Sequence, residues 1–95
     1  MPLFRKKPVV VEALTFDEMV NRGRAHAVAV VDGVPWSFEI NGYPVTHETD
    51  DEYLITTLEG THRMTRADML IIGIKGEIYP CKRDIFDATY EAVTP

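Results

Sequence analysis

Long apolar runs and a secretory leader are both missing from this chain of 95 residues. The longest apolar stretches, residues 9–11 and 27–31, fall far short of the ~20 residues that a membrane-spanning helix needs. The basic cluster at residues 5–7 is followed by a short apolar run that Glu12 interrupts, which does not fit a signal peptide. These absences predict a soluble, cytoplasmic protein without a membrane partner.

A surplus of positive charge is missing too. The chain has 10 basic and 15 acidic residues and a formal net charge of -5. Phosphate backbones reward a basic protein face, so no nucleic-acid partner is expected. The cluster at residues 5–7 is interpreted as a solvated flank of the N-terminus.

Cysteine is nearly absent. Cys81 stands alone, so no intrachain disulfide can form. The three histidines, His26, His47 and His62, lack the paired spacing of a structural zinc site. Phosphate-loop, dinucleotide, nucleophile-elbow and zinc-protease motifs are also missing. The sequence therefore predicts no metal and no cofactor.

The composition is that of an ordinary globular protein, with 45% hydrophobic and 26% charged residues. A chain of this length forms one domain, residues 1–95, around one core. The expected class is α+β: a mainly antiparallel sheet or partly closed barrel with one short helix and a C-terminal helical turn.

The N-terminal third predicts a strand followed by a helix. Three consecutive valines favour an extended chain over residues 7–14. A helix over residues 17–22 follows, which Thr15 or Asp17 can cap and Gly23 can end. Its apolar stripe comprises Phe16, Met19 and Val20.

Turn signals then predict hairpins. A strand over residues 26–31 stops at Asp32-Gly33, and Asn41-Gly42 is a strong hairpin signal. Residues 43–47 form the return strand, and Pro44 predicts an edge position for it. Between these turns, one face of a strand carries Trp36, Phe38 and Ile40.

Further strands are predicted beyond an acidic segment. Residues 47–52 carry four carboxylates that repel each other, and we interpret them as a solvated loop. Residues 53–57 and 61–65 form a hairpin, with Gly60 in the left-handed region. Residues 69–72 are the most hydrophobic strand and are expected at the centre of a sheet.

The C-terminal segment, residues 73–93, predicts a hairpin, a helical turn and a strand. Gly76 supplies a positive φ in the turn, and Pro80 is expected to end the strand that follows it. A helical turn over residues 82–87 leads to a last strand over residues 89–93, expected to lie near residues 7–14. The core anchors of this unit are expected to be Ile78, Ile85, Phe86 and Tyr90.

Two segments, RKKPVVVEAL at residues 5–14 and GIKGEIYPCKRDIFDATYEAV at residues 73–93, resemble a group of small phage and prophage proteins. Those proteins join a YRKKPVxxEA opening to a PGDWIxxGVKGExYPCKPDIFxxTYE ending, and the ending is similar to the PGDYG type. The resemblance covers about a third of the chain. It implies a phage or prophage origin, and hence the cytoplasm of a bacterial host, but no reaction.

The chain departs from that pattern at two places. Arg66-Ala67-Asp68-Met69 stands where the pattern has Pro-Gly-Asp-Trp, so a looser turn can replace a tight one. Arg83 stands where the pattern has proline. Residues 15–57 match no part of the pattern, and the resemblance carries no specificity located there.

Cys81 is the strongest candidate for catalysis. A helical turn that begins beside it and the neighbouring Lys82 and Arg83 would lower a thiol pKa. A nucleophile also needs a base within hydrogen-bond reach, and no histidine is close in sequence. A lone cysteine is more often a small buried hydrophobe. We therefore expect no catalytic residue and no enzyme.

Three functions remain open. The first is an accessory binding protein that captures a host protein or a small ligand. The second is a structural or oligomeric component, for example a homodimer built through an exposed strand. The third is a small enzyme that uses Cys81 or a pair of carboxylates. The possible partner-binding residues are Lys75, Glu77, Tyr79 and Lys82.

Overall fold

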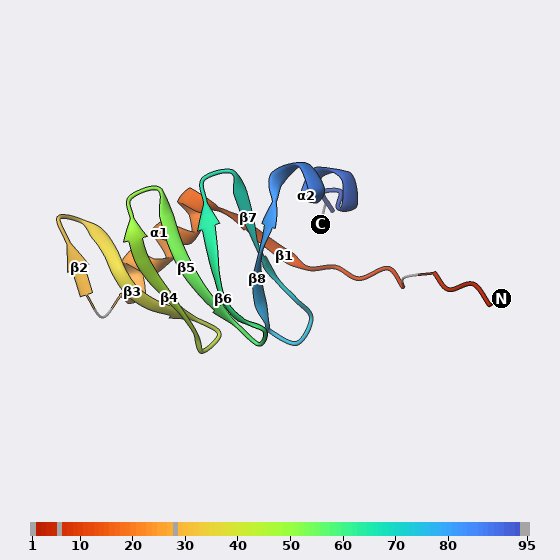
Figure 1. Cartoon of the computed structure of the whole chain (residues 1–95), viewed down its shortest axis with the longest axis horizontal. Helices are drawn as coiled ribbons and strands as arrows, with labels where there is room; N and C mark the ends of the chain where they lie inside the picture. Colours follow the sequence, from red (N-terminus) through yellow and green to blue (C-terminus); the bar gives the residue numbers. More distant parts are fainter. Residues whose placement is uncertain (1, 6, 28, 94–95) are drawn as a thin grey trace.

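The computed structural model describes residues 2–5, 7–27 and 29–93. Two helices and eight strands follow one another along these residues (Figure 1). They are β1 (Glu12–Thr15), α1 (Phe16–His26), β2 (Ala29–Val31), β3 (Val34–Ile40), β4 (Tyr43–Thr49), β5 (Glu52–Thr57), β6 (Gly60–Thr65), β7 (Asp68–Ile72), β8 (Ile78–Lys82) and α2 (Arg83–Thr89).

The strands form two antiparallel sheets. One has the order β1-β7-β8 and the other β2-β3-β4-β5-β6. The predicted α+β class and its antiparallel sheet are confirmed, and two separate sheets take the place of a partly closed barrel. The expectation that residues 69–72 form a central strand is also confirmed, because β7 lies between β1 and β8.

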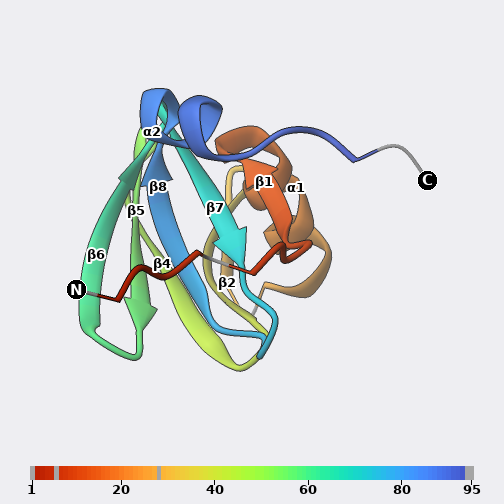
Figure 2. The same ribbon diagram turned by 90° about the vertical axis from the view of Figure 1, so that its right-hand side faces the viewer.

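One hydrophobic core joins both sheets to α1. Helix α1 contacts β1, β3 and β7, and β8 contacts β5 and β6 (Figures 1 and 2). The core side chains come from every one of these layers. They are Phe16, Met19, Phe38, Ile40, Val45, Tyr53, Ile55, Met64, Leu70, Ile72 and Ile78.

Helix α1 begins at a capping box. The Thr15 hydroxyl accepts a hydrogen bond from the Glu18 N–H at 3.2 Å, and the Glu18 carboxylate accepts one from the Thr15 N–H at 2.9 Å. Two of the free donors at the helix start are thereby satisfied. Of the two predicted caps, Thr15 is the one that is used.

The sequence predicted that the helix ends at Gly23, and this prediction is wrong. The helix continues to His26, and Gly23 is buried inside it. A Cβ atom at this position would overlap the Phe38 ring of β3. Gly23 therefore serves the close approach of the helix to the sheet, and not a turn.

Pro44 lies in an interior strand, and the edge position predicted from it is wrong. Strand β4 is placed between β3 and β5. The pairing of β4 with β5 begins at Val45, one residue beyond Pro44. The missing N–H of the proline therefore removes no hydrogen bond from that ladder.

Strand β3 has a bulge that changes the burial of its aromatic face. Ala29 pairs with Ser37 and Val30 with Pro35, so Trp36 has no partner in β2. Phe38 and Ile40 are buried, whereas Trp36 is 45% exposed. Its ring stacks on His47 at a centroid distance of 5.0 Å.

The acidic segment at residues 47–52 is not a loop throughout. Strand β4 runs to Thr49, and only Asp50 and Asp51 form the turn before β5. Arg66 approaches this turn from the β6–β7 connection. It pairs with Asp51 at 2.6 Å and with Asp17 of α1 at 3.0 Å, and its guanidinium lies 4.8 Å from the Phe16 ring centroid.

The C-terminal unit differs from its prediction in four respects. Strand β8 continues through Pro80, which an edge strand tolerates. Helix α2 extends to Thr89, supported by an Arg83–Asp87 pair one helical turn apart, and no strand follows it in residues 90–93. Ile78 is buried as expected, but Ile85 is exposed and Phe86 and Tyr90 are only half-buried.

The contact between Gly23 and Phe38 gives a first prediction. Gly23→Ala should lower the free energy of unfolding by about 1–3 kcal/mol, because overlap with the ring outweighs the gain in helix propensity. Denaturant unfolding measures this change. A double variant that also carries Phe38→Leu should lose less stability than the sum of the two single changes. A more stable Gly23→Ala protein would contradict the close packing.

Candidate functional site

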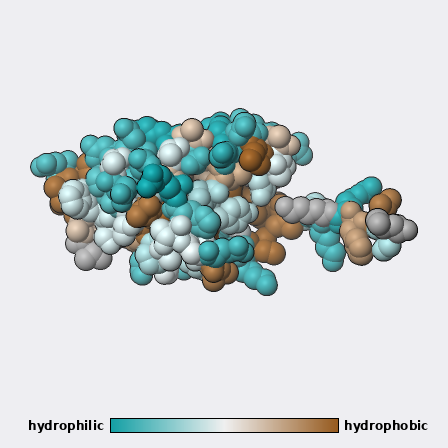
Figure 3. All heavy atoms as spheres, viewed as in Figure 1, coloured by the Kyte–Doolittle hydropathy of each residue, from teal (hydrophilic) through white to brown (hydrophobic). Residues whose placement is uncertain are grey.

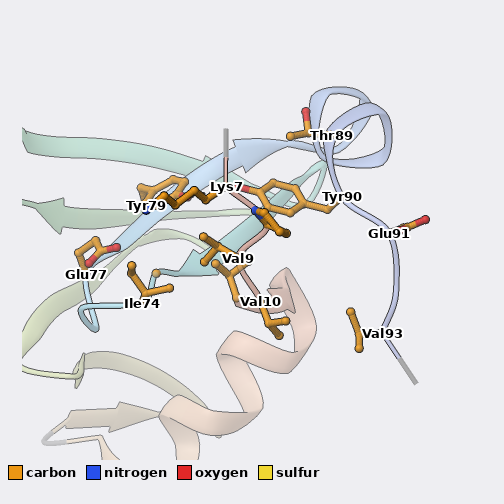
Figure 4. Close-up of a pocket in the computed structure, with 13 residues that line it drawn as sticks. Lys7, Val9, Val10, Ile74, Glu77, Tyr79, Thr89, Tyr90, Glu91 and Val93 are labelled. Atoms are coloured by element: carbon orange, nitrogen blue, oxygen red, sulfur yellow. Dashed lines mark hydrogen bonds between the residues drawn. The ribbon is translucent and has the colours of Figure 1, made fainter. Parts of the chain in front are cut away.

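A hollow of about 600 Å³ opens between the two ends of the chain, next to β8 (Figure 4). We call it the groove. Its lining comes from three parts of the sequence: residues 7–11, the β7–β8 connection with β8, and residues 89–93. The lining residues are Lys7, Pro8, Val9, Val10, Val11, Gly73, Ile74, Glu77, Tyr79, Thr89, Tyr90, Glu91 and Val93.

The first wall of the groove is the valine segment, residues 9–11. The sequence predicted a strand over residues 7–14, but the strand begins only at Glu12. Glu12 pairs with Ile72, the last residue of β7, so the segment before it runs past the end of its neighbour. Val10 is consequently 73% exposed, although β-branched residues favour a sheet.

The second wall is the segment after α2. The Tyr90 N–H donates to the Phe86 carbonyl at 2.9 Å, which closes the helix, and Tyr90 then takes an extended conformation. Residues 90–93 belong to no strand. The predicted last strand is therefore wrong, but this segment and the valine segment do line the same groove.

A carboxylate also lines the groove. Glu77 Oε2 accepts a hydrogen bond from the Lys75 N–H at 3.2 Å, and the Gly73 N–H donates to the Glu77 carbonyl at 2.8 Å. Gly73 has no Cβ, and one added there would overlap the Glu77 carboxylate. The Glu77 carboxylate thus accepts from a backbone group, and Arg66 pairs with aspartates elsewhere.

Two phenols complete the polar side of the groove. The hydroxyls of Tyr79 and Tyr90 lie 3.4 Å apart, and the Tyr90 ring stacks on Phe86. Burial, followed by the hydrogen bond with Tyr90, raises the pKa of Tyr79 to about 12. Tyr79 is therefore neutral at physiological pH and can both donate and accept a hydrogen bond.

A second hollow, of about 370 Å³, is also lined by Glu77 and Tyr79. Leu58 and His62 line it from the β5–β6 hairpin. Glu77 and Tyr79 line both hollows, so these two of the four possible partner-binding residues lie at the candidate site. Lys75 and Lys82 line neither hollow.

Sequence reasoning missed the apolar residues of the groove. Val9, Val10, Ile74 and Val93 are all large, apolar and exposed. The spheres in Figure 3 show apolar residues gathered where the N-terminal segment joins the body. The run of valines indicated an apolar segment, but the sequence pattern alone could not show that β7 ends before it reaches these valines.

Cys81 lies on β8, opposite Met69. Burial raises the pKa of its thiol, and the nearby charges of Asp68 and Asp84 raise it further. The cations beside it in sequence therefore do not produce the low thiol pKa of a reactive cysteine. Its thiol lies 3.6 Å from the Lys82 carbonyl.

In residues 2–5, 7–27 and 29–93, no three His, Cys, Asp or Glu side chains are grouped so that they could hold a metal ion. The same residues contain no helix long and apolar enough to cross a membrane. No protein-family model, curated protein or solved structure matches the chain.

The raised pKa of Cys81 predicts slow alkylation. At neutral pH the thiol should react more slowly than a free cysteine, because less of it is thiolate. Asp84→Asn removes one of the charges that raise the pKa, and it should speed the reaction. Iodoacetamide kinetics followed by mass spectrometry measure both rates. A parent rate above that of free cysteine would contradict this environment.

The raised pKa of Tyr79 predicts a loss of stability at high pH. Its folded pKa lies above the unfolded value of 10.0, so its contribution is complete below pH 10.0 and is lost toward about 12. Between pH 9 and pH 11, the parent should lose up to about 1 kcal/mol more unfolding free energy than Tyr79→Phe. Urea unfolding at both pH values measures this difference. Equal losses would show that Tyr79 is not held in its neutral form.

Proposed function

We propose that this protein is a binding module that captures an extended segment of a partner protein in the groove. The observation that carries the proposal is the pair of walls. Both present apolar side chains to one hollow, and neither belongs to a strand. The first wall leads into β1, which is an edge strand, and addition of an extended peptide at a sheet edge is a recurring mode of recognition.

The side chains of the walls define the chemistry of the captured segment. Val10, Ile74 and Val93 offer apolar surface that water now contacts. Removing such surface from water stabilises a complex by about 25 cal/mol per Å² before the costs of association. Alternate apolar side chains of an extended segment would point toward this surface.

The charges of the groove favour a basic segment. Glu77 and Glu91 both line it, and among the residues that the structure describes Lys7 is its single basic lining residue. A lysine or arginine on the captured segment would meet the Glu77 carboxylate, while the neutral hydroxyl of Tyr79 can accept from a backbone or side-chain donor. An acidic segment would be repelled.

The origin of the partner follows from the resemblance to phage and prophage proteins. A phage accessory protein acts on its host, so a protein of the bacterial host is the proposed partner. Catalysis through Cys81 has less support, because its raised thiol pKa opposes nucleophilic attack.

A direct binding measurement tests this function. The probe is a fluorescent seven-residue peptide of alternating valine and lysine, with a valine–glutamate peptide for comparison. The parent should bind the lysine peptide with a Kd on the order of micromolar and the glutamate peptide far more weakly. Val10→Asp should weaken binding at least about tenfold, because the valine side chains of the peptide would then face a carboxylate, while its lysines point to the opposite side of the extended chain.

The matched control is Val30→Asp. Val30 is 49% exposed on β2, outside the groove, so this change adds the same charge elsewhere and should leave peptide binding intact. Binding that Val10→Asp leaves unchanged, or that prefers the glutamate peptide, would refute the proposed function.

A further inference from the structure

The N-terminal residues 2–5, which we call the arm, extend beyond the groove and away from the body (Figure 1). The molecule measures 54 × 28 × 22 Å, elongated along the axis on which the arm lies. Leu3 is 92% exposed and Phe4 is 93% exposed. Two large apolar side chains thus find no cover on their own chain, which marks an interaction surface.

The arm and the body have opposite charges. Arg5 is the one charged residue of the arm, which contains no acidic residue. The remainder of the chain holds fifteen acidic residues against nine basic ones. The groove shares this acidic character through Glu77 and Glu91. The arm is thus an apolar and basic segment of the kind that the groove is built to accept.

The direction of the arm favours a second molecule as its acceptor. Lys7 and Val9 already form part of the groove wall, and residues 2–5 lie farther out, away from the body (Figure 1). A second copy can receive this arm and offer its own arm in return. Such an exchange is reciprocal, so it closes into a twofold dimer and does not propagate.

We propose that the arm of one copy docks in the groove of a second copy, and that the two copies exchange arms. Phe4 and Leu3 then cover the apolar side chains of the two walls, Val10 and Val93, and Arg5 approaches Glu77 or Glu91. This inference rests on the proposed function, because it uses the same groove. Arm exchange would compete with capture of a partner protein.

Sedimentation velocity over a concentration series tests the exchange. The full chain should shift from monomer to dimer as its concentration rises. Phe4→Asp and Val10→Asp should each remain monomeric, because one alters the arm and the other the groove. Val30→Asp should form dimers like the parent. Far-ultraviolet circular dichroism of Phe4→Asp should match the parent, since Phe4 touches no part of the core.

Mixing the two monomeric variants sharpens the test. Phe4→Asp has an intact groove and Val10→Asp has an intact arm, so an equimolar mixture should form a heterodimer with one arm–groove contact. A full chain that stays monomeric throughout, or a dimer that Phe4→Asp leaves intact, would overturn the exchange.

The two proposals fail separately. Phe4→Asp leaves the groove open, so it should bind the valine–lysine peptide at least as tightly as the parent does. If the full chain is monomeric but binds that peptide in a Val10-dependent way, the exchange is wrong and the proposed function stands. If Phe4→Asp does not bind the peptide, the proposed function is wrong.

Discussion

The burial of apolar side chains in a single core governs the rest of this structure. Helix α1 contributes Met19, the five-stranded sheet contributes Tyr53, and the three-stranded sheet contributes Leu70, all with at most 1% exposure. Tyr53 shows how closely the layers are tied, because its ring contacts Phe16 edge-on and its hydroxyl donates to the Pro35 carbonyl at 2.6 Å. With 95 residues the chain can build one such core, and the core ends before the chain does.

The groove is a consequence of where that core ends. Strand β7 stops at Ile72, and the turn that follows it leaves the valines before Glu12 without a neighbour. Helix α2 has no buried residue, and the segment after it lines the same groove as the valines without joining a sheet. The apolar surface left at this end of the molecule supports a binding function that the core itself does not need. Glu77 and Tyr79 add the polar groups that give such a surface its selectivity.

Much of the fold could be predicted because its signals are local. Asn41-Gly42 and Gly76 adopt the positive φ values that their turns require, and the Thr15–Glu18 capping box starts α1. The errors arose where tertiary contacts override local preference. Gly23 was predicted to end the helix but allows the close approach of Phe38. Pro44 was predicted to mark an edge strand but lies one residue outside the β4–β5 ladder. The groove could be predicted only in part, since its walls meet through the arrangement of β7, β8 and α2.

Amide hydrogen exchange of the Phe4→Asp protein, with and without the valine–lysine peptide, tests the central claim most directly. This variant keeps the groove free of a second copy's arm, so any protection reports the peptide alone. The account predicts slower exchange in residues 9–11 and 90–93 on binding, because their backbone gains a strand neighbour. Residues 29–31 form β2, an exposed strand that also carries valine side chains. Their exchange rates should be unchanged. Protection confined to β2, with none in the two walls, would contradict the assignment of the groove as the binding site.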